Sequence, residues 1–247
     1  MKKLIEISIV LFSIVLLPSC SNNKIKGDAN SSENNNDTIV TDIDGNVYHT
    51  VTIGAQVWMV ENLKTTKYRN GVSIDNVTDQ WQQLKIKTGA YCNYDNDVNN
   101  SKSYGRLYNW HALNDSRGLC PKGWHIPSDN EWKTLEMFLG MSQSSADTAS
   151  GWRGKDEGGK LKSASNLWES PNTGATNSSG FSALPSGRRI FITNYCEIGE
   201  CGNYWTSTLY GDGAVTAYYR SLRYNDAKIL REITACSSGN SCRCIKD

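Results

Sequence analysis

The hydrophobic positions of this chain form one near-continuous run at the start and short, interrupted runs afterwards. The first run, from Ile7 to Leu17, follows Lys2 and Lys3 and ends at Pro18. At about eleven residues, it is too short to cross a ~30 Å hydrocarbon layer as a helix. A basic start, a short apolar centre and a small-residue end are typical of a secretory signal peptide, which we place at residues 1–19.

The residues after this run are almost entirely polar, and a cysteine lies at the junction. The tetrapeptide Leu17-Pro18-Ser19-Cys20 resembles the lipobox of bacterial lipoproteins, although the proline within it is a departure. We expect Cys20 to become the first mature residue and to carry lipid such as palmitate, since two or three acyl chains give a stable anchor. An ordinary signal peptide is the alternative. Residues 20–39 would be a flexible tether, and Ser21 favours the outer membrane, with the protein facing the periplasm or the exterior.

Alternating residues in the remaining part of the chain predict β-strands. In DGNVYHTVTIGAQVWMVENL, residues 44–63, Val47, His49 and Val51 lie on one side of an alternating run, and Gly54 marks a turn. This pattern predicts a hairpin in which His49 is a strand residue rather than a ligand. Further strands are expected in GNYWTSTLY, AVTAYYRSLRY and SCRCIKD.

One segment, GWHIPSDNEWKTLEMFLG, has a helical pattern. Ser128 and Glu131 form a capping box directly after Pro127. Four apolar residues follow at helical spacing, and Gly140 supplies a stop: Trp132, Leu135, Phe138 and Leu139. We therefore predict a helix over residues 129–139 with this stripe in the core. His125, which has no second histidine at metal-ligand spacing, is expected to be structural.

Composition and charge restrict the class of protein. About 205 residues remain after the signal peptide and tether, enough for one sizeable core. The formal net charge of +1 argues against a nucleic-acid partner. Eight Trp and twelve Tyr are expected to fill mainly the core, with a few rings exposed for ligands.

Motifs for metal binding and catalysis are weak, so we predict no cofactor and no enzymatic activity. Asp95, Asp97 and Asn99 alternate as in a calcium loop, but Asn100 and Arg106 stand where such a loop needs Gly and Glu. The cysteine spacings do not match those of a structural zinc site. No Ser/His/Asp or Cys/His constellation can be assembled around the three histidines.

Several long blocks, taken together, resemble a known family. In order they are DGNVYHTVTIGAQVWMVENL, YGRLYNWHAL, GLCPKGWHIPSDNEWKTL, GGKLK, WESPNTGATNSSGFSALPSG and GNYWTSTLY. They resemble the Fibrobacter succinogenes major paralogous domain of exported bacterial proteins over residues 40–247. The resemblance implies an α+β fold of the C-type lectin-like type, which also includes formylglycine-generating oxidases. That fold has twisted antiparallel strands, one or two helices and long irregular loops, but fold alone does not imply function.

Seven cysteines besides Cys20 suggest disulfides in an exported chain. We predict a long bridge between Cys120 and Cys244, which is the cysteine that stands at the customary position of the family's closing strand. Two local bridges are also predicted, which leaves Cys92 free: Cys196–Cys201 and Cys236–Cys242.

The resulting hypothesis is an anchored, non-enzymatic binding module for a glycan or a surface protein. A structural component of a surface complex is the alternative, and an oxidase related to the formylglycine-generating enzymes is a weaker one. Ligand-binding residues are expected in the loops of residues 166–212, namely Trp168, Asn172, Arg188, Tyr204 and Trp205. The alternative is that these Trp residues are core. Since Ser170 stands where calcium-type lectins carry an acidic residue before Pro-Asn, we expect calcium-independent binding.

Overall fold

The computed structural model describes residues 39–78, 88–190, 195–213 and 215–247. The predicted signal peptide, Cys20 and nearly all of the predicted tether therefore lie outside the described residues. Within those ranges, no helix is both long enough and apolar enough to cross a bilayer.

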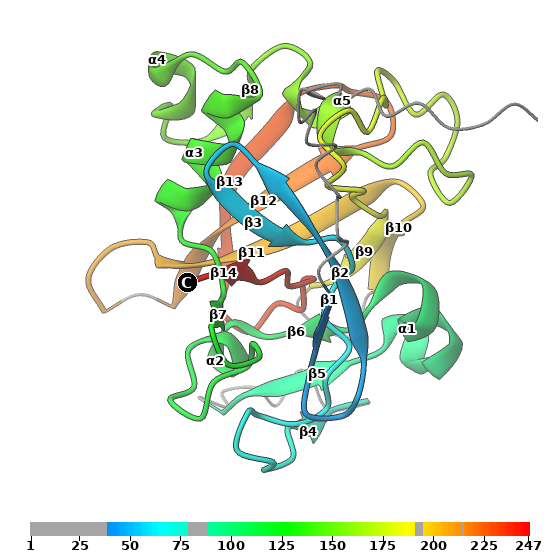
Figure 1. Ribbon diagram of the computed structural model, residues 1–247, viewed down its shortest axis with the longest axis vertical. Helices are drawn as coiled ribbons and strands as arrows, with labels where there is room; N and C mark the ends of the chain where they lie inside the picture. Colours follow the sequence, from blue (N-terminus) through cyan, green and yellow to red (C-terminus); the bar gives the residue numbers. More distant parts are fainter. Residues whose placement is uncertain (1–38, 79–87, 191–194, 214) are drawn as a thin grey trace, which may run out of the picture. The chain divides into compact units, whose positions relative to one another are not determined.

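The described strands form three sheets (Figure 1). The first has the order β1-β2-β3-β14-β7, with bounds Ile39–Thr41, Val47–Ile53, Gln56–Met59, Ile245–Lys246 and Trp124–His125. The second has the order β10-β9-β11-β12-β13-β8, with bounds Tyr195–Ile198, Ser186–Arg189, Cys201–Leu209, Thr216–Arg223, Ile229–Ala235 and Gly151–Arg153. The third has the order β4-β5-β6, with bounds Asp75–Asn76, Ala90–Cys92 and Leu107–Tyr108.

The helices are short and stand between the strands. The described part of the chain has five α-helices and a 3-10 turn, η2 (Tyr94–Asn96). The helices are α1 (Val98–Tyr104), α2 (Trp110–Leu113), α3 (Asp129–Phe138), α4 (Gln143–Ala146) and α5 (Glu157–Leu161). The fold is therefore α+β and rich in β-sheet, as the resemblance implied.

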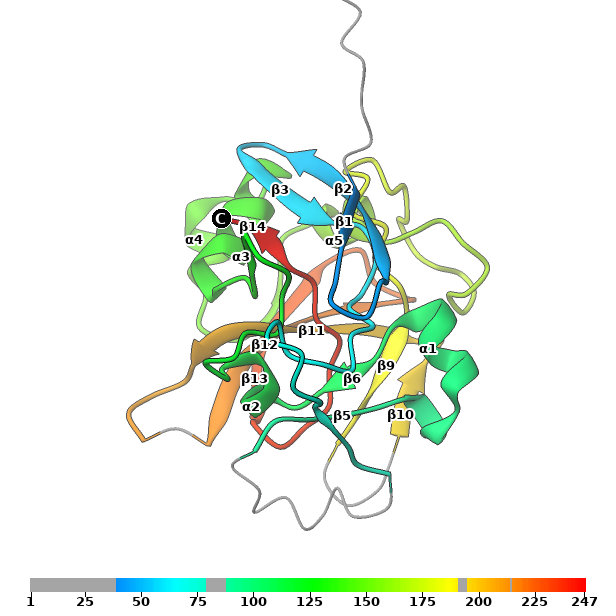
Figure 2. The same cartoon turned by 60° about the horizontal axis from the view of Figure 1, so that its bottom comes forward.

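The predicted hairpin is confirmed. Strands β2 and β3 pair with Val51 opposite Trp58, and Gly54 has a φ of +62° between them. Gly54 can adopt this left-handed conformation because it has no Cβ. Strand β14 then adds to β3, with Ile245 opposite Trp58, so the chain ends inside the sheet that begins the domain (Figure 2).

The capping box is also confirmed, because the Ser128 hydroxyl accepts from the Glu131 N–H and Glu131 Oε2 accepts from the Ser128 N–H at 2.7 Å.

The prediction that the apolar stripe of this helix lies in the core is only partly right, since Phe138 is 63% exposed. Two carboxylates occupy the buried face beside Trp132 and Leu135 instead, because three arginines of the second sheet face the helix there.

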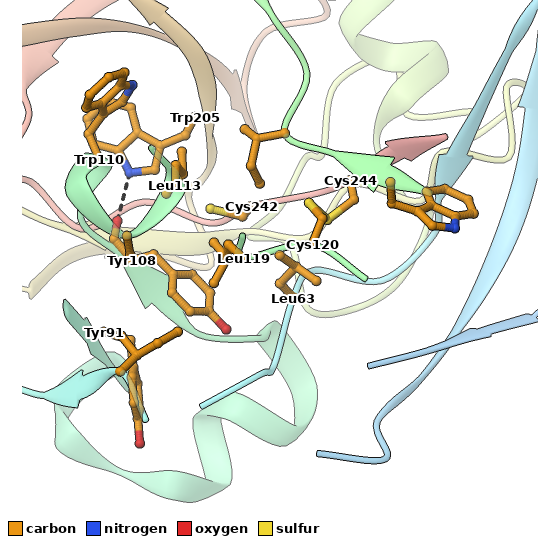
Figure 3. Packing of buried hydrophobic residues seen from close by; sticks show 14 of the residues in the cluster. Leu63, Tyr91, Tyr108, Trp110, Leu113, Leu119, Cys120, Trp205, Cys242 and Cys244 are labelled. Carbon is orange, nitrogen blue, oxygen red and sulfur yellow. Dashed lines mark hydrogen bonds between the residues drawn. A yellow bond between two sulfur atoms is a disulfide. The ribbon is translucent and has the colours of Figure 1, made fainter. Parts of the chain in front are cut away.

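Aromatic rings fill the core, as predicted. Trp132 packs against Trp58 with ring centroids 5.2 Å apart and against Tyr204 at 5.9 Å. A second cluster surrounds Tyr108 and Trp205, where Trp205 Nε1 donates to the Tyr108 carbonyl at 2.7 Å (Figure 3). This bond satisfies the polar atom that the Trp205 ring brings into the core, whereas Trp132 Nε1 is buried without a hydrogen-bond partner in the described residues.

Candidate functional site

The predicted ligand-binding rings are part of the core. Trp168, Tyr204 and Trp205 are almost completely buried, so the prediction that they stack on a ligand is wrong. Tyr204 and Trp205 are consecutive residues of β11, so their side chains point to opposite faces of the sheet, and each belongs to a different core cluster. Trp168 Nε1 donates inward, to the Ala183 carbonyl at 3.0 Å.

The polar members of the predicted site fix the loop rather than face a ligand. Arg188 pairs with Glu197 at 2.9 Å and donates to the Tyr219 hydroxyl at 3.2 Å. Asn172 donates from Nδ2 to the Ser163 carbonyl at 3.0 Å. The structure therefore does not bring the five predicted residues together around one open site.

The weak calcium motif has a structural use. Asp97 is the N-cap of α1, and its side chain accepts from the Asn99 N–H at 2.8 Å. In the described part of the chain, no group of three His, Cys, Asp or Glu residues is placed to hold a metal ion.

The long disulfide is confirmed. Cys120 and Cys244 are bonded with a Cα–Cα distance of 6.0 Å across a sequence separation of 124 residues (Figure 3). It ties the segment before β7 to the last strand. Cys92 is a buried free thiol, as predicted.

The two predicted local bridges are wrong, because Cys196, Cys201, Cys236 and Cys242 are free thiols. Strand β9 lies between β10 and β11, which carry the first pair. Strands separated by a third lie about 9.6 Å apart, beyond the ~7 Å Cα limit for a disulfide. In the second pair the thiols are also unbonded, and the two carbonyls bind different segments: that of Cys236 accepts from Trp110 N and that of Cys242 from Leu63 N.

A cavity of about 220 Å³ lies elsewhere, beside the long disulfide. Its walls are the turn after β1, the loop after β3 and the segment that leads to β7. The lining combines hydroxyl, apolar and charged side chains: Thr41, Asp42, Ile43, Thr65, Arg69, Leu119, Cys120, Pro121 and Lys122. On its core side, Leu119 and Cys120 belong to the cluster drawn in Figure 3.

The first wall is a turn organised by Asp42. Its Oδ1 accepts from the N–H groups of Asp44 and Asn46 at 3.0 and 2.9 Å. Its Oδ2 accepts from Asn46 Nδ2 at 2.8 Å and from the Tyr48 hydroxyl at 2.6 Å. An aspartate that satisfies the backbone of its own turn in this way fixes the local conformation.

The second wall is joined to the first by Asp44. Asp44 accepts from the Thr66 N–H at 2.6 Å and pairs with Lys67 at 3.0 Å. Burial opposes ionisation, but the hydrogen bonds from Thr66 and Lys67 prevail and lower the pKa of Asp44 below its ordinary value. The carboxylate therefore stays charged and keeps both walls in register.

The third wall is held by Arg69. Its Nε donates to the Cys120 carbonyl at 2.9 Å and its terminal nitrogen to the Trp124 carbonyl at 3.2 Å. With the disulfide at Cys120, the wall is fixed by both covalent and hydrogen bonds. The cavity is thus preformed, a property of most small-ligand sites.

Sequence reasoning did not identify this cavity, because its residues come from three separate segments with no shared motif. The one signal that could have found it is the cysteine bridge, since Cys120 lines the cavity. The lining of the cavity offers hydroxyl groups, apolar surface and fixed charges, which are groups that bind a ligand. Cys120 is in a disulfide and is therefore not a free thiol.

Comparison with known proteins identifies a family but no named relative. The family model of the Fibrobacter succinogenes major domain matches residues 51–246, most of the chain. The comparison with curated proteins and the comparison with solved structures found no match to this chain.

Proposed function

The chain belongs to the Fibrobacter succinogenes major domain family, and we propose that it is an envelope-anchored, non-enzymatic binding module. The preformed cavity beside the Cys120–Cys244 bridge carries this proposal. Its volume of about 220 Å³ is below the ~300 Å³ at which sites for drug-sized ligands begin, so it fits one small unit such as a sugar ring. We further propose the C-type lectin-like type of fold, which the mixed sheets and long loops support.

Binding of glycans can be tested with the full mature chain in detergent on a glycan array, with and without a chelator. We expect a bound glycan, and binding that survives chelation. Thr41→Tyr should abolish binding by filling the cavity. Thr52→Tyr is the matched control, because Thr52 is an exposed strand residue of the adjacent β2 that does not line the cavity. Binding that resists Thr41→Tyr would place the ligand elsewhere.

The anchor is proposed on the sequence alone. Cys20→Ala should abolish metabolic labelling by fatty acid, and Ser32→Ala should leave the labelling unchanged. Continued labelling of the Cys20→Ala chain would contradict the lipoprotein assignment.

A role in assembly of a surface complex is supported by a different region. The β11–β12 hairpin exposes Tyr210 by 50% and Val215 by 77%, and Leu209 is also exposed beside them. Exposed apolar side chains grouped at a strand connection are typical of contacts with other proteins. Two results together would favour assembly over ligand binding. The hairpin would cross-link to a partner protein on intact cells, and the glycan array would show no bound glycan.

A further inference from the structure

We propose that the ligand of the cavity is a sugar with an anionic group, and that Arg69 and Lys122 bind that group. This proposal rests on the binding function proposed above and names the chemical class of the ligand. The shared chemistry is a carboxylate, phosphate or sulfate attached to a sugar ring.

The guanidinium of Arg69 is oriented before any ligand arrives. Two of its nitrogens donate to the carbonyls of Cys120 and Trp124. A guanidinium has five N–H donors in one plane, so the other donors remain for a ligand. Carbonyl acceptors fix the plane of the group but leave its positive charge without a counter-ion.

The two cations that line the cavity, Arg69 and Lys122, differ from nearby cations in their ion pairs. Lys67 is paired with Asp44, and Arg117 forms a two-pronged pair with Asp115 at 2.7 Å. Across the residues that the structure describes, neither Arg69 nor Lys122 makes an ion pair. The neighbours outside the lining are thus neutralised, whereas the two cations inside it are not.

The acidic residue in the lining does not compensate for these charges as a ligand group. Both oxygens of Asp42 are already occupied by four donors within the β1–β2 turn and β2. A cationic ligand would have to displace these bonds, whereas an anionic group meets free donors on the opposite wall. Arg and Lys are the side chains that bind carboxylate, phosphate and sulfate groups most strongly.

The remaining lining suits a sugar ring better than a free inorganic anion. Ile43, Leu119 and Pro121 present apolar surface, while the exposed Thr41 presents a hydroxyl. A pyranose ring carries both apolar C–H faces and hydroxyl groups, whereas a free inorganic anion makes no favourable contact with apolar side chains. The cavity therefore combines both kinds of contact that an acidic sugar needs.

The test measures binding of three pairs of ligands to the full mature chain in detergent by calorimetry. Each pair matches a charged sugar to its neutral counterpart: a uronic-acid disaccharide, a hexose phosphate and a hexose sulfate. Lys122→Glu is the main variant, because Lys122 is exposed and lines the cavity. Arg69→Lys keeps the charge and removes the planar fork. Lys155→Glu makes the same charge change at an exposed lysine outside the lining.

We expect at least one charged sugar to bind and its neutral counterpart not to bind. Lys122→Glu should weaken that binding by at least about tenfold, as expected for a lost charged hydrogen bond. Lys155→Glu should leave it unchanged, and the charged sugar that binds identifies the anionic group. Two results would overturn this proposal and leave the binding module standing. One is binding of neutral sugars alone. The other is binding of an acidic sugar that neither Lys122→Glu nor Arg69→Lys weakens. If none of these sugars binds, the proposal of an acidic sugar fails, and the glycan array decides separately whether the binding module stands.

Discussion

Two of the regions in which this domain buries positive charge differ in what faces that charge. Between α3 and the second sheet, Glu136 contacts Arg153 at 2.9 Å and Arg220 at 2.6 Å, and Asp129 contacts Arg220 and Arg231 at 2.8 Å each. We call these five residues the carboxylate network. All are buried.

The other region is the loop after α5, where a lysine is buried without a carboxylate in contact. Lys162 Nζ donates to the carbonyls of Thr173, Arg223 and Asp226 at 2.8, 2.9 and 2.9 Å. No carboxylate of the described residues forms an ion pair with it. The ammonium group therefore joins the end of α5 to the loop at Thr173 and to the β12–β13 turn.

The difference appears in the pKa values. Burial raises the pKa of Asp129, but hydrogen bonds and charges of Arg231 and Arg220 outweigh it and lower the value to about 2. Burial lowers the pKa of Lys162 to about 8, and only the more distant charge of Asp226 opposes it. Buried charge is thus favoured where full counter-charges face it and disfavoured where only dipoles do.

The largest effect should come from removing a counter-charge. Glu136→Gln leaves Arg153 and Arg220 facing a neutral amide in a buried site, which costs about 3–5 kcal/mol in the free energy of unfolding. Denaturant titration measures this loss. Glu200→Gln, at an exposed glutamate, should change stability by less than about 0.5 kcal/mol. A loss below about 1 kcal/mol for Glu136→Gln would show that the arginines do not depend on their carboxylates.

Removal of the lysine should cost less. Lys162→Met keeps most of the side-chain volume but leaves three carbonyls without their donor, and we expect a loss of about 2–3 kcal/mol. The exposed Lys155→Met is the matched control and should be nearly neutral. If Lys162→Met lowered the free energy of unfolding as much as Glu136→Gln, carbonyl dipoles would stabilise a buried charge as well as carboxylates do. The two regions would then not differ in this respect.

Local features of this fold could be predicted from sequence because neighbouring residues determine them. The Ser128–Glu131 capping box and the Gly54 turn each depend on a few consecutive residues, and both are as expected. The long disulfide was predicted from the resemblance to a family, since no local pattern relates Cys120 to Cys244.

Features that depend on distant segments could not be predicted. An apolar stripe at helical spacing implied a buried Phe138, but the arginines that draw Asp129 and Glu136 inward come from strands up to 102 residues away. In the same way, Trp168 and Trp205 are equally suited to a ligand site and to a core. The packing of distant segments around Trp168 and against β11 decides between these uses.

Acid should weaken the carboxylate network. The pKa of Asp129 is about 2 in the folded protein against 3.8 for the ordinary group, so its stabilisation is complete above pH 3.8 and is lost as pH falls through 2. The full contribution is about 2 kcal/mol. We expect the stability difference between the wild type and Asp129→Asn to shrink by this amount from pH 5 to pH 2. A constant difference would contradict the lowered pKa.

The loop lysine should gain stability as the pH rises through the alkaline range. Its pKa falls from 10.5 in the ordinary group to about 8 in the folded protein, so the unfolded chain holds more protons between these values. Stability linked to Lys162 therefore rises with pH over this window. The shift from 10.5 to about 8 corresponds to a rise of about 3 kcal/mol between pH 7.5 and pH 10.5.

The measurement is the difference in free energy of unfolding between the wild type and Lys162→Met, followed from pH 7.5 to pH 10.5. The buried tyrosines also titrate on unfolding at alkaline pH, but they are shared by both proteins, so their contribution cancels in the difference. The difference should be constant for Lys155→Met over the same range. If the difference for Lys162→Met fell with pH, the carbonyls would be stabilising the ammonium form beyond its cost of burial. Lys162 would then behave like a member of the carboxylate network, with three carbonyl dipoles in place of a carboxylate.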